Sequence, residues 1–150
     1  IGRKVSSLLE AFGAKIYFVD PHIDNKNKPE NLISKEQAIS IADIITIHVN
    51  KEVKILDSDD FKMMKKNAFV LNSSRGKCIS DRDLIDAIEN KTLKGAWIDT
   101  FDEEPYSGPL IKYDNIILTP HAASFTEECR VEMEFEASKN IINFLRDNLI

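Results

Sequence analysis

The sequence predicts an α/β fold built around a doubly wound, mostly parallel sheet. Short apolar runs alternate along the chain with amphipathic stretches of helical period, which is the pattern of βαβ units. The predicted strands are residues 15–19, 44–49, 68–71, 93–98 and 116–118. Hydrophobic residues make up 43% and charged residues 30% of the 150 positions, which is typical of one globular domain with a sizeable core.

A helix begins almost at residue 1 and leads into the first predicted strand. Its amphipathic stripe runs from Ser6 to Phe12 and ends at Gly13, a residue suited to the position just after a helix. The strand 15–19 follows and ends at Asp20. A helix that leads into a strand ending in an acid is the second half of a dinucleotide-binding βαβ unit.

Gly2 and Asp20 together predict a Rossmann-like nucleotide site. Gly2 would be the third glycine of a G-x-G-x-x-G fingerprint, and it precedes Asp20 by 20 − 2 = 18 residues, close to the usual interval of about 20. The Asp20 carboxylate can accept from both ribose hydroxyls and repels a 2′-phosphate, so we expect NAD rather than NADP. An aspartate that only caps the next turn is the alternative. The first strand would then precede Ile1, and we expect the chain to be a part of a longer polypeptide.

Four further helices are predicted from capping residues that precede apolar stripes. Ser34 with Gln37 has the pattern of a capping box, and Asp57 and Ser80 are favourable N-cap residues. The predicted ranges are 34–40, 57–67, 80–88 and 126–149. The segments 21–34 and 106–115 are expected to be surface loops.

Charge and residue content exclude several classes of function. The net charge of −5 argues against nucleic acid or an anionic membrane as the main partner. Neither a membrane-spanning apolar run nor a secretory h-region is found, so we expect a cytoplasmic protein. Cys78 and Cys129 have no CxxC spacing, and the three histidines lack ligand partners at usable spacing, so no metal site is expected.

Three polar groups of different chemistry follow directly after three of the predicted strands. Arg75, Glu104 and His121 stand past the third, fourth and fifth strand. Ligands bind at the carboxyl ends of the strands in an open α/β sheet, so these side chains are expected at one crevice. A cation, a carboxylate and an imidazole together predict a reaction centre rather than a binding face. His48, at the end of the strand 44–49, is expected to pack near a cofactor rather than to act as a catalyst.

The motifs around these residues resemble those of the D-isomer-specific 2-hydroxyacid dehydrogenases. Asn72–Gly76 is similar to the family pattern N-x-[ST/A]-R-G, Asp99–Pro105 to D-x-[FY]-x-x-E-P, and Thr119–His121 to [TS]-P-H. The order and spacing of the motifs agree as well, and the resemblance covers nearly the whole chain. It implies the nucleotide-binding domain of an oxidoreductase that transfers a hydride between NAD(H) and a D-2-hydroxy acid or its 2-keto acid.

The resemblance also implies roles for single residues. Arg75 would bind the substrate carboxylate and polarise the carbonyl, His121 would be the general acid or base, and Glu104 would orient His121. Asp99 would anchor the nicotinamide carboxamide. These roles suit the side chains, because imidazole titrates near neutral pH and a guanidinium binds a carboxylate bidentately. The implied cofactor contacts are Ile1, Gly2, Asp20, Val49, Asn50, Ser73, Ser74, Arg75, Asp99 and His121.

The resemblance further implies an organisation beyond the nucleotide site. Residues 1–126 are expected to form the NAD-binding domain. Residues 127–150 would return, after a hinge at 123–126, toward a substrate domain that lies mostly outside this chain. Family members usually pair through their nucleotide domains, so a homodimer is implied. The segment 50–56 is shorter than usual and lacks the family proline, which leaves the contacts of Val49 and Asn50 open.

Two other functions are compatible with parts of this pattern. Certain transcriptional corepressors share the fold and keep the arginine, glutamate and histidine, so an NAD(H)-sensing scaffold is an alternative. A Rossmann domain of another dehydrogenase is a third interpretation, but it does not explain three motifs in order. Lactate, glycerate, phosphoglycerate and branched 2-hydroxy acids are all compatible substrates.

Overall fold

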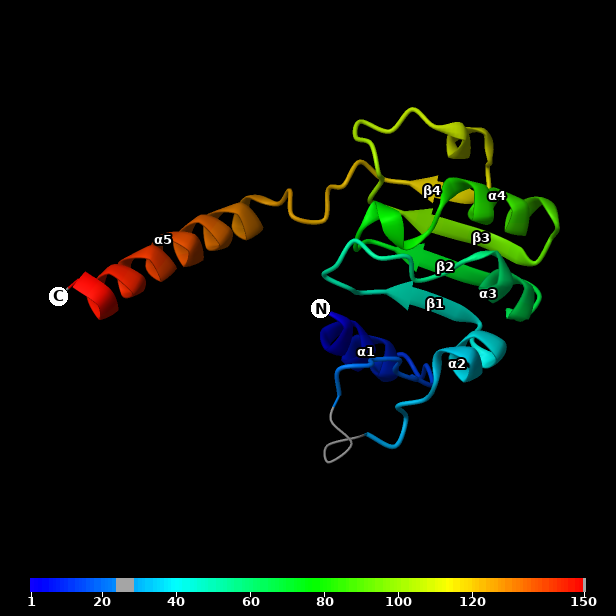
Figure 1. The fold of residues 1–150 in the computed structure, drawn as a ribbon, viewed down its shortest axis with the longest axis horizontal. Helices are drawn as coiled ribbons and strands as arrows, with labels where there is room; N and C mark the ends of the chain where they lie inside the picture. The colour runs from blue at the N-terminus through cyan, green and yellow to red at the C-terminus, as the bar shows by residue number, and fades with distance from the viewer. Residues whose placement is uncertain (24–28, 150) are drawn as a thin grey trace. The chain divides into compact units, whose positions relative to one another are not determined.

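The structure is a computed structural model, which describes residues 1–23 and 29–149. The chain divides into two compact units, Ile1–Pro120 and His121–Ile150. Within the described part of the first unit, four strands form one parallel sheet in the order β1–β2–β3–β4 (Figure 1). They are β1 (Ile44–Ile47), β2 (Ala68–Asn72), β3 (Leu93–Ile98) and β4 (Ile116–Leu118). The expected Rossmann-like, parallel α/β fold is confirmed.

The helices described in the first unit begin, except for the one at Gly2, at the capping residues predicted from the sequence. They are α1 (Gly2–Ala11), α2 (Lys35–Ile41), α3 (Ser58–Met63) and α4 (Asp81–Glu89), with short 3-10 turns at Gly76–Cys78 and Pro109–Lys112. Ser34 and Gln37 make both hydrogen bonds of the capping box at the start of α2. Asp57 caps α3, and the Ser80 hydroxyl accepts from a backbone N–H in the first turn of α4.

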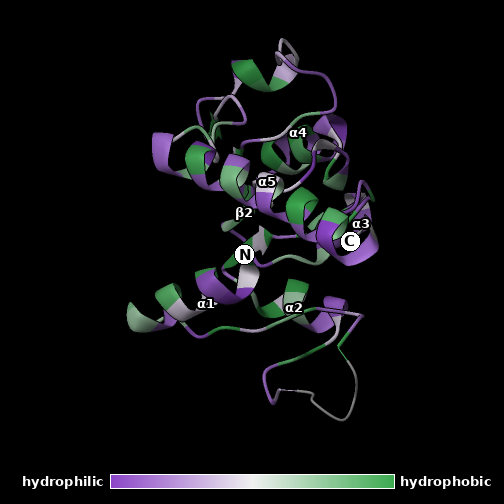
Figure 2. Ribbon diagram, turned by 90° about the vertical axis from the view of Figure 1, so that its left-hand side faces the viewer, coloured by the Kyte–Doolittle hydropathy of each residue, from purple (hydrophilic) through white to green (hydrophobic). Residues whose placement is uncertain are grey.

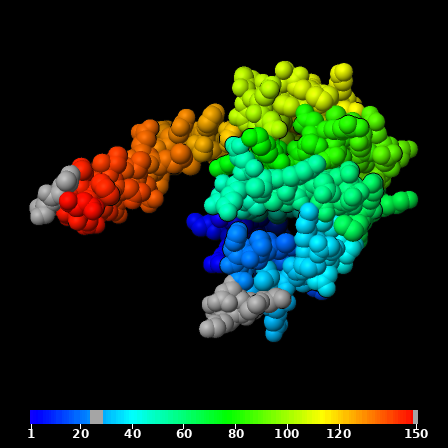
Figure 3. All heavy atoms as spheres, viewed as in Figure 1, coloured from blue at the N-terminus to red at the C-terminus, as the bar shows by residue number. Residues whose placement is uncertain are grey.

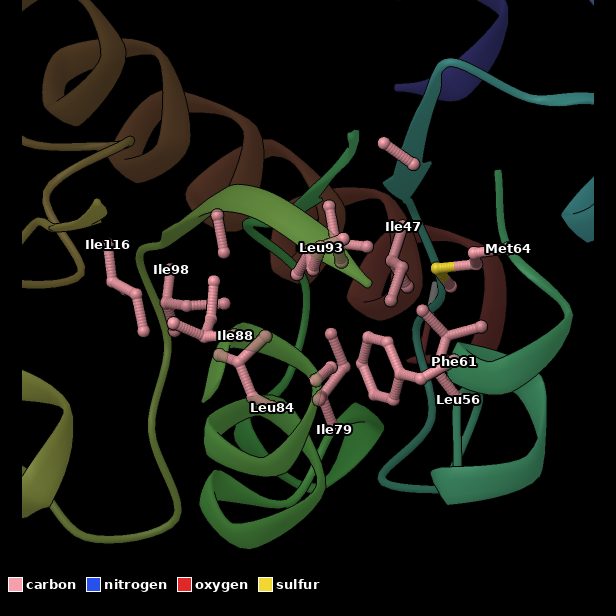
Figure 4. Packing of buried hydrophobic residues seen from close by; sticks show 14 of the residues in the cluster. Ile47, Leu56, Phe61, Met64, Ile79, Leu84, Ile88, Leu93, Ile98 and Ile116 are labelled. Atoms are coloured by element: carbon pink, nitrogen blue, oxygen red, sulfur yellow. The ribbon is translucent and has the colours of Figure 1, made fainter. Parts of the chain in front are cut away.

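The hydrophobic core lies between one face of the sheet and the helices α3 and α4. Figure 4 shows Leu84 and Ile88 of α4 in the same cluster as Ile98 of β3, while Phe61 of α3 directs its ring into that cluster. These four side chains are between 1% and 9% exposed. Burial of each such side chain contributes about 1.5–3 kcal/mol to the free energy of folding. The core therefore fixes the sheet from the side of α3 and α4.

The prediction of a buried strand at 15–19 is wrong. In the described part of the chain this segment makes only one isolated parallel bridge, from Phe18 to Leu32, and it does not join the sheet. Tyr17 and Val19 are 37% and 48% exposed. A strand requires hydrogen-bonded neighbours, and an apolar run in the sequence does not specify them.

The end of α3 differs from the prediction, whereas the end of α1 agrees with it. The helix predicted to reach Asn67 ends at Met63, because Met64 turns into extended backbone and its side chain enters the core. Asn67 then has a φ of 67°. The end of α1 is as predicted, since Gly13 has a φ of 85° that glycine adopts without steric cost. Of the predicted loop 21–34, residues 24–28 lie outside the described residues.

The second unit contains the helix α5 (Glu127–Leu149), which agrees with the helix predicted at 126–149. Figure 2 shows hydrophobic and hydrophilic residues interspersed along α5. Its exposed large apolar side chains, which include Val131, Phe135, Ile141, Phe144 and Leu145, are 43–64% exposed. The helix is therefore not held by a hydrophobic core of its own unit.

Candidate active site

The turn after β2 carries Arg75 and is held by the side chain of Asn72, which is 1% exposed. The Asn72 amide donates from Nδ2 to the Arg75 carbonyl at 2.9 Å. Its Oδ1 accepts from the Ser74 N–H at 3.1 Å and from the Ser74 hydroxyl at 2.8 Å. A buried amide with these partners fixes the conformation of the turn. The turn leaves the Arg75 side chain exposed at the carboxyl end of β2.

The next residue, Gly76, packs directly on the backbone of the loop that follows β3. A Cβ atom at Gly76 would lie 2.1 Å from the Phe101 carbonyl carbon and 2.4 Å from the Asp102 nitrogen. No side chain fits this gap, so only glycine allows the two loops to touch. The contact joins the Arg75 turn to the loop that carries Glu104.

Glu104 is exposed and lies in the loop after β3. Its Oε1 accepts from the Phe101 N–H at 3.1 Å, so the side chain folds back over its own loop. Phe101 stacks on Tyr106 with the ring centroids 4.2 Å apart, and the Tyr106 hydroxyl donates to the Asp81 carboxylate at the start of α4. Burial, and to a smaller extent the hydrogen bond to Asp81, raises the pKa of Tyr106. The Tyr106 hydroxyl is therefore a neutral donor. The loop of Glu104 is thereby anchored to α4.

Asp99 follows β3 and is 2% exposed. Side chains alternate along a strand, so Asp99 points to the face opposite that of Ile98, which lies in the core. Its N–H donates to the Asn72 carbonyl at 2.9 Å, and its Oδ1 accepts from the Thr119 hydroxyl at 2.5 Å. A carboxylate held in this way is suited to accept from an amide nitrogen of a bound ligand.

His121 is the first residue of the second unit, and its side chain is exposed. Its φ of 51° lies in the left-handed region, which is uncommon for a residue other than glycine. Backbone conformations of this kind cluster at functional sites. Arg75 and Glu104 both belong to the first unit, whereas His121 belongs to the second unit.

The start of α1 has the features of a phosphate-binding helix end. Ile1 is the N-cap residue, and its side chain cannot accept a hydrogen bond from the first turn. A Cβ atom at Gly2 would lie 3.5 Å from the His48 Cβ, so α1 begins against the end of β1. Figure 3 shows α1, in blue, beside the teal atoms of the β1 region. Backbone N–H groups at a helix start bind phosphate, so this end fits a dinucleotide pyrophosphate.

His48 is therefore close to the expected cofactor site, in the position predicted for a packed histidine. Its Nε2 lies 3.0 Å from the Thr46 hydroxyl. Burial lowers the pKa of His48, which favours the neutral ring at pH 7. The ring packs under the start of α1 as a neutral group.

Asp20 lies at the surface of the first unit, after the isolated bridge of Phe18. Its Oδ1 accepts from the His22 N–H at 2.9 Å, so Asp20 caps the turn that follows it. A carboxylate has about four acceptor positions, and capping uses one of them. The remaining positions are compatible with two ribose hydroxyls.

The segment after β1 is tied to the Arg75 turn by an ion pair. Val49 packs against the core and Asn50 is exposed. Further along, Glu52 pairs with Lys77 at 2.8 Å. The hydrogen bond and charge of Lys77, and to a smaller extent the charge of Arg75, hold the pKa of Glu52 below its ordinary value. The Glu52 carboxylate is thus close enough to interact electrostatically with the Arg75 guanidinium.

A pocket of about 330 Å³ lies on the α4 side of the sheet. Thr100, Leu84 and Tyr106 line it, so it lies opposite the face to which Asp99 points. Among residues 1–23 and 29–149, no group of three or more His, Cys, Asp or Glu side chains is placed to hold a metal ion. Across those same ranges, no helix combines the length and apolar character needed to cross a membrane.

The contacts of the motif residues Asn72, Gly76 and Thr119 were not predicted from the sequence. The sequence does indicate the contact of Asn72, because an asparagine two residues before a serine at a strand end is typical of an Asx turn. The partner of Gly76 lies 25 residues further along the chain (101 − 76), and that of Thr119 lies 20 residues earlier (119 − 99). No local pattern reveals such contacts.

Comparison with known proteins gives relatives among dehydrogenases and reductases. A glyoxylate reductase from Thermofilum pendens is 31% identical over 160 residues, which cover 99% of this chain and 47% of that protein. A D-lactate dehydrogenase from Staphylococcus epidermidis is 34% identical over 165 residues, covering 95% and 50%. The solved structure of a D-2-hydroxyisocaproate dehydrogenase matches with a TM-score of 0.89 at 25% identity, covering 100% and 51%.

The chain spans about half the length of these relatives. Residues 1–123 match the NAD binding domain of the D-isomer specific 2-hydroxyacid dehydrogenases. A match over that length, together with the three ordered motifs, excludes a Rossmann domain of an unrelated dehydrogenase. The start of α1 fits the pyrophosphate of the dinucleotide. The chain belongs to the D-isomer specific 2-hydroxyacid dehydrogenase family and carries its NAD-binding domain.

Proposed function

We propose that this chain is the cofactor-binding part of an NAD-dependent oxidoreductase that interconverts a D-2-hydroxy acid and its 2-keto acid. The observation that carries the proposal is the contact at Gly76, which brings the Arg75 turn against the loop of Glu104. The names of the relatives support it, since lactate is a 2-hydroxy acid and glyoxylate a 2-keto acid. The nicotinamide supplies the hydride.

Arg75 binds the substrate carboxylate in this proposal. Its side chain is exposed at the carboxyl end of β2, where Nη1 donates to the Ser74 carbonyl at 2.6 Å, and its backbone carbonyl is fixed by Asn72. A guanidinium binds a carboxylate through two parallel hydrogen bonds, which also orient the neighbouring carbonyl group. The nearby Glu52 is held by Lys77, so it does not neutralise Arg75 as a direct ion-pair partner would.

His121 gives a proton to the developing alkoxide during reduction and removes it during oxidation. Glu104 hydrogen-bonds and orients the imidazole. Support comes from the Thr119–His121 motif, from the left-handed backbone of His121, and from the position of Glu104 in the loop joined to Arg75. Imidazole is suited to this role because it titrates near neutral pH.

The cofactor is bound along the carboxyl edge of the sheet in this proposal. Ile1 and Gly2 contribute the helix start for the pyrophosphate, Asp20 binds the adenosine ribose, and Asp99 anchors the nicotinamide carboxamide. The implied further contacts are Val49, Asn50, Ser73, Ser74, Arg75 and His121. Asp20 selects NAD over NADP by repelling a 2′-phosphate.

The wider organisation follows the family pattern. Residues 1–126 form the NAD-binding domain, and residues 127–150 return after a hinge at 123–126 toward a substrate domain that lies mostly outside this chain. The exposed apolar side chains of α5 support such a role. We further propose a homodimer and a cytoplasmic location. Sedimentation of the full protein tests the dimer, and a monomer alone would contradict it.

The test of the reaction is the oxidation of NADH by the full protein with a panel of 2-keto acids, with NADPH in parallel. Turnover with NADH on at least one acid is expected. Arg75→Ala and His121→Ala should each lower kcat/KM by about 100-fold or more, and Glu104→Gln should chiefly move the acidic limb of the pH profile.

Two outcomes would contradict the proposal. Wild-type turnover in His121→Ala would remove the acid–base assignment. Tight binding of NADH without turnover of any acid would favour the NAD(H)-sensing scaffold instead.

A further inference from the structure

A chain of two hydrogen bonds leads from an indole to the carboxylate of Asp99. The Trp97 Nε1–H donates to the Thr119 hydroxyl at 2.9 Å. That hydroxyl lies 2.5 Å from Asp99 Oδ1. Trp97 and Asp99 share one face of β3 because side chains alternate along a strand. Thr119 reaches them from beyond β4, whose Leu118 pairs with Ile98.

The direction of these bonds follows from the donors that are available. An indole nitrogen can only donate, so the Thr119 oxygen accepts from Trp97. The single hydroxyl proton of Thr119 is then directed to Asp99, which acts as the acceptor. A bond from a hydroxyl to a carboxylate is charge-assisted and stronger than a neutral one. Asp99 is thereby fixed in rotation as well as in position.

The backbone around Asp99 is fixed independently of this chain. The Asp99 N–H donates to the Asn72 carbonyl, and the Thr119 N–H donates to the Ile98 carbonyl at 3.0 Å. Loss of the Thr119 hydroxyl would therefore leave both strand ends in place. It would remove one hydrogen bond that orients the carboxylate.

We infer that Trp97 and Thr119 are positioning residues for the cofactor: they hold the Asp99 carboxylate in the orientation that accepts from the nicotinamide carboxamide. The inference rests on the proposed function, which gives Asp99 its partner. It adds two residues that do not touch the cofactor themselves. Their effect is directed at one chemical group, the carboxamide NH₂, and at no other part of the dinucleotide.

The test compares two cofactors that differ only at that group. NADH carries the carboxamide NH₂, whereas reduced 3-acetylpyridine adenine dinucleotide carries a methyl group in its place and cannot donate. Dissociation constants of both are measured by calorimetry for the full wild-type protein and for Thr119→Val, which removes the hydroxyl at nearly constant volume. We expect Thr119→Val to weaken NADH binding about tenfold and to change binding of the acetyl analogue less than about twofold.

Three further variants separate positioning from folding. Thr119→Ser keeps a hydroxyl and should retain most of the NADH affinity. Trp97→Phe keeps an aromatic ring but removes the indole donor, and it should weaken NADH binding about threefold because Thr119 can then rotate. Thr92→Val makes the same change beside the amino end of β3 and should bind both cofactors like the wild type.

The outcomes distinguish this inference from the proposed function. Equal weakening of both cofactors by Thr119→Val, or no weakening of either, would overturn the inference while the proposed function stands. Wild-type protein that binds neither cofactor would overturn the proposed function and the inference with it. If Thr119→Val does not fold, equal NADH affinity in Trp97→Phe and wild type would overturn the inference.

Discussion

The carboxyl edge of β2 and β3 and the turn at Asp20 both carry proposed ligand contacts, yet they are held in opposite ways. At the sheet edge, Asn72 and Asp99 are 1% and 2% exposed and each makes several hydrogen bonds. Asp20 is exposed, and the bond that caps its turn reaches only two residues along the chain. The proposed contacts at the edge of β2 and β3 thus depend on buried tertiary contacts. The proposed contact of Asp20, which selects the cofactor, depends on a local turn.

The most severe test of this comparison is the replacement of Gly76. In Gly76→Ala the new Cβ would meet the Phe101 backbone, so the two loops must separate. We expect a loss of at least about 3 kcal/mol in the free energy of unfolding and a fall of about 100-fold in kcat/KM. Urea denaturation and NADH oxidation measure the two effects.

The matched control for that variant is Gly13→Ala. A Cβ there meets nothing within 4 Å, although its φ of 85° strains an alanine. We expect about 1 kcal/mol of destabilisation and unchanged turnover. Equal loss of activity in both variants would show that the Gly76 contact does not position Arg75.

The second test removes the amide that holds the Arg75 turn. Asn72→Ala leaves the Ser74 N–H and the Arg75 carbonyl without their partner in a buried site. We expect about 2 kcal/mol of destabilisation and a KM for the keto acid that rises about tenfold, because Arg75 loses its fixed backbone. Asn115→Ala, whose amide bonds at the protein surface, is the control and should leave KM unchanged. A normal KM in Asn72→Ala would contradict the positioning role.

The third test concerns the exposed turn and should affect selectivity only. Asp20→Ala removes the carboxylate that repels a 2′-phosphate, so we expect the preference for NADH over NADPH to fall about tenfold. The midpoint of urea denaturation should change little, since Asp20 is exposed and its bond to the His22 N–H is local. Asp114→Ala provides a change of equal charge at the opposite end of the sheet. An unchanged cofactor preference would leave Asp20 with the capping role alone.

The smallest effect is expected from the ion pair between Lys54 and Asp83, at 2.7 Å. Lys54 holds the pKa of Asp83 below its usual 3.8 in the folded protein. A carboxyl group whose pKa is lowered by folding stabilises the folded protein at pH values above its unfolded-state pKa. This stabilisation is lost as the pH falls through the folded-state pKa. Asp83→Asn should therefore cost less than about 1 kcal/mol at pH 7 and a smaller amount near pH 2.

Urea denaturation at both pH values measures this difference. Asp86→Asn is the control, because its partner Arg82 lies 4.0 Å away and both side chains are exposed. A cost that stays the same at pH 2 would show that the ion pair is not its source.

The sequence by itself determined the local parts of the fold. Ser34, Asp57 and Ser80 start helices because each can accept a hydrogen bond from a backbone N–H a few residues further on. Gly13 ends α1 because it adopts a positive φ without cost. Four apolar runs became strands of the sheet, and the motifs led to the correct family. The helix starts and the end of α1 rest on interactions among near neighbours in the sequence.

Only the tertiary structure decided which segments meet. The run 15–19 has the same apolar character as the strands, yet among the described residues its backbone makes one isolated bridge and stays outside the sheet. Gly76 and Thr119 act on residues 25 and 20 positions away, counted as 101 − 76 and 119 − 99. The physical reason is that an apolar pattern specifies burial but not the partner, whereas close packing and directional hydrogen bonds specify the partner.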